Sequence, residues 1–153
     1  MKIVLLFILF LATVLSASPE EDMNLIIDAV YRADGETVYR GLSNENQEAI
    51  SMVMVMMTLA PDQVALQLRE QLDVQISPSE VASLSEQGLV AVIIDSPFFR
   101  RELPYSRDMI TCESHTMLGD TALVYLSVSD GDSLYGYPMM LQEGSWRIAG
   151  NFF

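Results

Sequence analysis

The chain has 153 residues, with 21 acidic residues against eight basic ones and a formal net charge of −13 at neutral pH. That balance disfavours nucleic acid and anionic membranes as partners. The single cysteine, Cys112, excludes an internal disulfide framework.

Residues 1–17 have the features of a secretory signal peptide. Lys2 is followed by an apolar run from Ile3 to Leu15, and small residues occupy positions 16–18. The run is shorter than the roughly 20 residues that a membrane span needs. We therefore expect a secreted or periplasmic protein whose mature part, residues 18–153, is a single domain. Removal of the signal leaves seven arginines against 21 acidic residues, and we expect no membrane association afterwards.

Helices are predicted over about residues 20–95. Acidic residues 20–22 suit the N-terminus of a first helix, which should stop near Asp34-Gly35. Pro61 suits the first turn of a third helix. The string Ser77-Pro78-Ser79-Glu80 is typical of a capping box with proline at the first helical position, so a fourth helix is expected there.

A second helix is predicted from the N-cap Ser43 to Thr58. Its part from Ile50 to Leu59 is apolar almost all round, which predicts that it is the central, buried helix. Thioethers bind monovalent copper, and this helix carries methionines at 52, 54, 56 and 57. The valines between these methionines favour core packing instead, so no metal site is predicted.

The segment before the sheet is less regular. Its run from Leu89 to Ile94 suits either a strand, because it is rich in β-branched residues, or the end of a helix, and we interpret it as helical. From Phe98 to Arg107 we predict a loop rich in arginine and aromatic residues.

A four-stranded antiparallel meander is predicted over about residues 105–151. Its tight turns are expected at Gly119-Asp120, Asp130-Gly131 and Glu143-Gly144. Two-residue loops at the last two turns would pair Val124 and Leu126 with Tyr137 and Tyr135, and Leu141 and Met139 with Trp146 and Ile148. All these side chains would then share the inner face of a sheet with one buried side.

The same count through Gly119-Asp120 places Glu113 and His115 on the inner face and the free thiol of Cys112 on the outer face. A carboxylate beside an imidazole can fix its tautomer, so the first two could act as a general base and its partner. The alternative is that both lie at a wet end of the sheet. The predicted ligand-binding residues are Glu113, His115, Tyr135, Tyr137 and Trp146, although such an aromatic stripe is more often core.

The strings Gly119–Val124 and Glu143–Ile148 resemble the nuclear transport factor 2-like superfamily, and most of all its small secreted bacterial members. The resemblance implies an α+β fold in which N-terminal helices pack on a curved four-stranded antiparallel meander. This arrangement is a cystatin-like cone with a pocket at its wide end. Members include isomerases, dehydratases, hydrolases and transport adaptors, so the fold does not settle the activity.

Three functions remain open at this stage. The first is a non-catalytic binding module for a small apolar ligand in the cone or for a protein partner on the outer face of the sheet. The second is an isomerase- or dehydratase-like enzyme that uses Glu113 and His115. The third is a dimeric structural protein that pairs through its sheet. No cofactor is predicted, because no phosphate loop, nucleophile elbow or paired metal-ligand spacing is present.

Overall fold

The computed structural model describes residues 17–129 and 134–150. The helices are α2 (Pro19–Tyr31), α3 (Gly35–Arg40), α4 (Asn44–Leu59), α5 (Pro61–Leu72), α6 (Pro78–Ser83), α7 (Glu86–Asp95), α8 (Pro97–Glu102) and the 3-10 helix η1 (Arg107–Met109). The strands are β1 (Ile110–Leu118), β2 (Thr121–Val128), β3 (Leu134–Gln142) and β4 (Ser145–Ile148), paired in that order. The predicted α+β class, with helices followed by an antiparallel meander packed against them, is confirmed. The proposed signal peptide and the Asp130-Gly131 turn lie outside the described residues.

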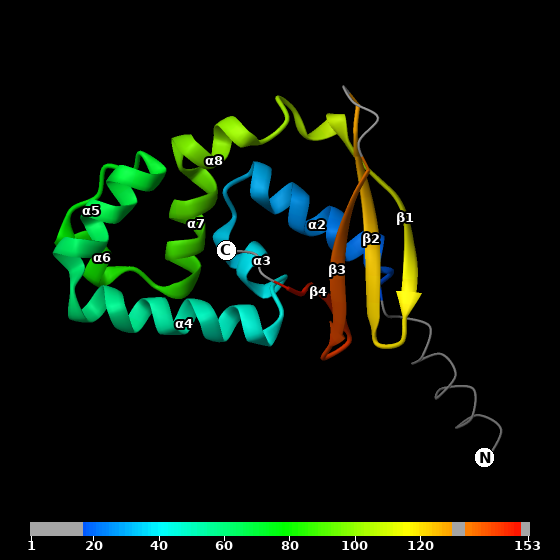
Figure 1. The fold of residues 1–153 in the computed structure, drawn as a ribbon, viewed down its shortest axis with the longest axis horizontal. Helices are drawn as coiled ribbons and strands as arrows, with labels where there is room; N and C mark the ends of the chain where they lie inside the picture. Colours follow the sequence, from blue (N-terminus) through cyan, green and yellow to red (C-terminus); the bar gives the residue numbers. More distant parts are fainter. Residues whose placement is uncertain (1–16, 130–133, 151–153) are drawn as a thin grey trace, which may run out of the picture.

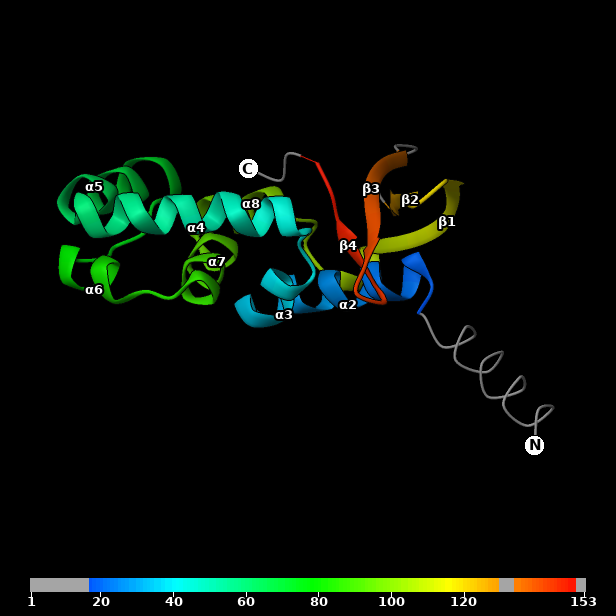
Figure 2. The ribbon, with the colours of Figure 1, turned by 90° about the horizontal axis from the view of Figure 1, so that it is seen from below.

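The sheet and the helices α4 to α8 lie at opposite ends of the molecule, with α2 and α3 between them (Figure 1, Figure 2). Helix α2 covers one face of the sheet. It buries a stripe of residues three and four apart: Met23, Ile26, Ile27 and Val30. The sheet contributes Ala122, Val124, Leu126, Met139, Trp146 and Ile148 to the same core. We call the far group, α4 to α8, the helical lobe.

Local capping signals account for most helix starts. Ser43 caps α4 and Ser77 forms a capping box with Glu80 at α6, as predicted, and Ser18 forms a second capping box with Glu21 at α2. The helical interpretation of residues 89–94 is also confirmed, although these belong to a separate helix, α7.

Two short helices were not predicted. Asp34, expected to end a helix, caps α3 through a hydrogen bond from the Thr37 amide. The loop predicted from Phe98 to Arg107 is wrong over residues 98–102, because Ser96 caps α8 by accepting from the Phe99 amide. Residues 103–106 lie outside helices and strands, as predicted. From α8 the chain continues through residues 103–106 and η1, which contacts α2, into β1.

The strand register agrees with the predicted count around the turns. Val124 pairs with Tyr137 and Leu126 with Tyr135, while Met139 pairs with Ile148 and Leu141 with Trp146. The Glu143-Gly144 turn has positive φ at both residues, 53° and 84°, as a type I′ hairpin requires. Sequence parity therefore predicted the face of β2, β3 and β4.

Strand β1 departs from that count at one residue. Ser114 pairs with Tyr125 and Cys112 with Leu126, so Glu113 is the extra residue of a β-bulge. The predicted inward position of Glu113 is wrong, since its exposed side chain accepts a hydrogen bond from Ser127. The predicted outward position of Cys112 is also wrong. Cys112 packs against the core, and this burial raises the pKa of its thiol.

The predicted burial of α4 is wrong as well. It buries Asn46, Ile50 and Met57, but Met52, Val53, Val55, Met56 and Leu59 are exposed. Helix α5 then turns away from α4 by 118°. Within the described residues no single helix has the length and hydropathy to cross a membrane. Only α4 and α5 taken together, bent as they are, have the length and composition of a membrane span.

Candidate ligand-binding pockets

His115 lies on the inner face as predicted, but its partner comes from elsewhere in the chain. Its Nδ1 is 2.5 Å from Oε1 of Glu20, in the first turn of α2. Burial raises the pKa of Glu20, but hydrogen bonds from His115, from the backbone and from Ser18 outweigh burial, so the pKa ends below its usual value. The predicted pairing of Glu113 with His115 is wrong, because the bulge puts the two side chains on opposite faces.

The three predicted aromatic residues have different surroundings. Trp146 is a core residue, 7% exposed, and its backbone amide donates to Asp22 at 2.7 Å. Tyr135 is 51% exposed and Tyr137 is 37% exposed. Tyr137 lines a cavity of about 520 Å³ between α2, α8 and the sheet, and the other four predicted residues do not line it. This cavity extends to Gly150, where the described part of the chain ends.

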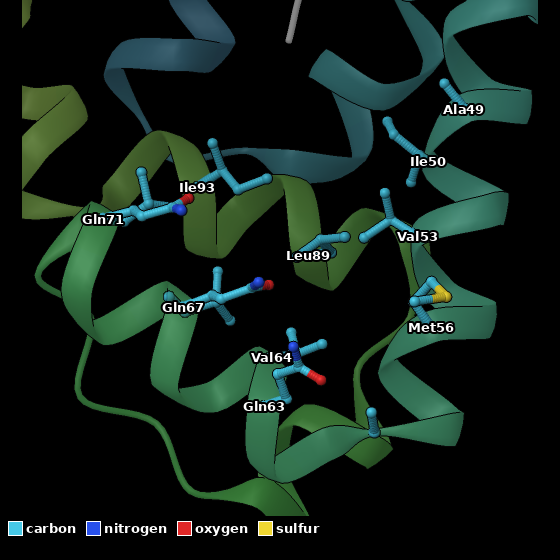
Figure 3. Close-up of a pocket in the computed structure, with 13 residues that line it drawn as sticks. Ala49, Ile50, Val53, Met56, Gln63, Val64, Gln67, Gln71, Leu89 and Ile93 are labelled. Atoms are coloured by element: carbon cyan, nitrogen blue, oxygen red, sulfur yellow. The ribbon is translucent and has the colours of Figure 1, made fainter.

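A second pocket, of about 440 Å³, lies wholly within the helical lobe (Figure 3). We call it the helical pocket. Its lining comes from α4 (Ala49, Ile50, Val53, Met56), from Ala60, from α5 (Gln63, Val64, Gln67, Leu68, Gln71, Leu72) and from α7 (Leu89, Ile93). Figure 3 shows these side chains converging from the three helices on a common space. Its volume falls within the range usual for small-molecule sites.

The sequence of α5 builds one wall of the helical pocket from two parallel rows. Residues four apart lie on the same face of a helix, one turn above another. One row contains Val64, Leu68 and Leu72, and the other contains Gln63, Gln67 and Gln71. The apolar row includes a buried member, Leu68, whereas the glutamine row is exposed. The wall is therefore apolar at its base and neutral and polar at its rim.

The opposite wall and the floor are apolar. Ile50 and Leu89 are each 3% exposed and close the floor, whereas Val53 and Met56 are exposed and stand at the mouth. No charged side chain lines the helical pocket among the described residues. In a chain with a net charge of −13, that lining favours a neutral and largely apolar guest, because a charged guest would lose hydration without gaining a charged partner.

The helical pocket was not predicted from the sequence. The repeat of glutamines next to the repeat of aliphatic residues over 63–72 was visible in the sequence, but the angle between α4 and α5 was not. Among the described residues, no group of three or more histidine, cysteine, aspartate or glutamate side chains is arranged to hold a metal ion. No family model, curated protein or solved structure matches the chain.

Proposed function

We propose that the chain is an exported, non-catalytic binding module for a small apolar ligand, and that the ligand lies in the helical pocket. The observation that carries this proposal is the charge-free apolar lining of a pocket of about 440 Å³. The proposal keeps the predicted superfamily, with its curved, cone-shaped sheet, as the fold assignment. It moves the ligand from the inner face of the sheet to the helices.

The lining also suggests what the ligand looks like. Its aliphatic floor gives a favourable environment for a hydrocarbon chain or ring, since burying apolar surface contributes roughly 25 cal/mol per Å². The rim amides of Gln63, Gln67 and Gln71 can both donate and accept hydrogen bonds. A neutral molecule with an apolar body and one hydroxyl, carbonyl or ester group fits this combination best.

The enzyme alternative has less support. It required Glu113 to act together with His115 inside a pocket, and the bulge separates them. Neither residue lines the cavity beside Tyr137 or the helical pocket. The contact between His115 and Glu20 joins β1 to α2, which is a sufficient structural role for both side chains.

Two measurements test the proposal. Native mass spectrometry of protein purified from its own host should detect a retained neutral ligand. Fluorescence of the neutral apolar probe N-phenyl-1-naphthylamine should rise on binding. The Gln67→Glu substitution should weaken probe binding about tenfold, because the new carboxylate would lose hydration when the pocket fills.

Gln75→Glu is the matched control, since Gln75 is exposed and does not line the helical pocket. It should leave probe affinity unchanged. Equal loss in the two variants, or unchanged binding in Gln67→Glu, would show that the ligand does not occupy the helical pocket. Displacement of the probe by the ligand extracted from the purified protein would connect the two measurements.

A further inference from the structure

Helix α4 carries an exposed apolar surface beside the mouth of the helical pocket. We call Met52, Val55 and Leu59 the outer stripe; they are 67%, 59% and 75% exposed. Their spacing of three and four residues aligns them along one face of the helix. None of the three lines the helical pocket. The stripe therefore has no role in the proposed ligand site and is left without a covering element by the described residues.

The extent of this surface is large for a small monomer. Together with the neighbouring Val53 and Met56, at 45% and 59% exposure, the stripe presents on the order of 600 Å² of apolar surface, the upper end for a typical monomer. Two such surfaces in contact would bury about 1,200 Å², which reaches the lower end of stable protein interfaces. An exposed apolar surface of this size commonly marks a site of interaction with another protein.

Charge decides which partner fits. Residues 49–61 contain no charged side chain, in a chain with 21 acidic residues. Two copies repel each other through most of their surfaces, and the uncharged face of α4 is a place where they can approach closely. A lipid surface fits less well. No basic residue lies between Arg40 and Arg69, whereas interfacial helices usually combine lysine or arginine with aromatic residues.

We propose that the outer stripe binds the outer stripe of a second copy of this chain, so that α4 packs against α4 across a twofold axis. A twofold interface uses the same patch on both subunits, and an uncharged apolar helix is complementary to itself. The pairing differs from dimerisation through the sheet. Its surface includes Val53 and Met56, which stand at the mouth of the helical pocket, so dimerisation and ligand binding can influence each other. Sedimentation and probe binding measure the two separately, and either inference can fail without the other.

Sedimentation velocity of the protein purified from its own host, over a range of micromolar concentrations, tests the pairing. The native protein should sediment as a dimer. The Val55→Glu substitution should raise the dimer dissociation constant by about a hundredfold or more, because it would bury two unpaired carboxylates in the interface. Val55 is exposed in the subunit, so the substitution should not disturb the fold. At concentrations where the native protein and the Val55→Glu variant are both monomeric, their circular dichroism spectra and thermal unfolding should be the same.

Two matched controls locate the interface. Leu25→Glu places the same charge at an exposed leucine of α2, and Leu134→Glu places it on β3; these residues are each 57% exposed. Both variants should remain dimeric. A monomeric native protein, a dimer that survives Val55→Glu, or a dimer that only Leu134→Glu dissociates would overturn the inference. Co-purification of a different protein that only Val55→Glu releases would overturn it too.

Discussion

At the scale of single residues, the carbonyl of Ile148 joins the last strand to the helical lobe. It accepts hydrogen bonds from the Ser43 amide at 2.9 Å and from the Asn46 side chain at 3.1 Å. The Ile148 amide donates to Gly41 at 2.7 Å, and Leu42 forms a parallel bridge to Ile148. The edge of β4 is thereby paired rather than left open. Asn46 is only 8% exposed, so water could not easily replace its side-chain amide as the hydrogen-bond donor to the Ile148 carbonyl.

The Asn46→Asp substitution should destabilise the fold by about 2–3 kcal/mol, because a carboxylate oxygen would replace the donor facing the Ile148 carbonyl. Asn44→Asp is the control, two residues earlier in the same first turn, where the Asn44 side chain accepts from Arg147 and is exposed. It should change stability by less than about 0.5 kcal/mol. Urea unfolding measures both. Equal effects would mean that the helix terminus, and not the buried hydrogen bond, determines the result.

At the scale of elements, features that depend on neighbours in the chain were predictable from sequence. The caps at Ser43 and Ser77 and the turn at Glu143-Gly144 require only local residue chemistry. The bulge at Glu113 was not predictable, because no glycine or other local signal marks it and only pairing with β2 reveals the extra residue. The exposure of α4 could not be predicted for a similar reason. Its composition is that of a core helix, and burial depends on what packs around it.

The position of the bulge predicts how β1 should respond to the deletion of single residues. Without Glu113, Cys112 and Ser114 become consecutive, and β1 alternates regularly with Cys112 still facing the core. That variant should fold, and its thiol should react with Ellman's reagent as slowly as in the native protein, at least about tenfold slower than in urea. Deleting Thr116 instead, from a regularly paired run, should lower the melting temperature markedly, since His115 would turn away from Glu20. A fast-reacting thiol in the folded native protein would show that β1 has no bulge.

At the scale of the whole molecule, the helical lobe is attached to the rest through a close contact between α3 and α7. A Cβ atom added at Gly35 would lie 2.3 Å from the Gln87 carbonyl oxygen, so only glycine allows the two helices to approach this closely. From the sequence, Gly35 was expected only to end a helix. Its importance for packing involves residues more than fifty positions away, which is why local patterns did not reveal it.

The same junction contains a carboxylate that links three helices. Glu86 of α7 accepts hydrogen bonds from Tyr39 of α3, at 2.6 Å, and from Ser51 of α4. The hydrogen bond from Ser51, followed by that from Tyr39, lowers the pKa of Glu86 although burial opposes it. Burial, then the hydrogen bond to Glu86 and its negative charge, raises the pKa of Tyr39 to about 12. Ionised Glu86 with neutral Tyr39 is therefore the state that the fold favours.

The junction should make stability depend on pH in a defined way. A lowered pKa means that Glu86 contributes stability fully above its unfolded value of 4.5, and that this contribution is lost as the pH falls through the folded value. Tyr39 contributes fully below its ordinary value of 10.0 and loses its contribution as the pH rises towards about 12. Between these limits, Glu86→Gln should cost about 1–2 kcal/mol in unfolding free energy.

Urea unfolding of the native protein and of Glu86→Gln across this pH range measures the difference directly. The difference should stay constant through neutral pH and shrink below about pH 4.5, because protonated Glu86 resembles glutamine in charge. Exposed Glu48→Gln, on α4, should change stability by less than about 0.5 kcal/mol at neutral pH. A Glu86→Gln difference that does not vary with pH would mean that the charge of Glu86 does not contribute to holding α7 against α3 and α4. The carboxylate would then have no part in positioning α4 and its pocket.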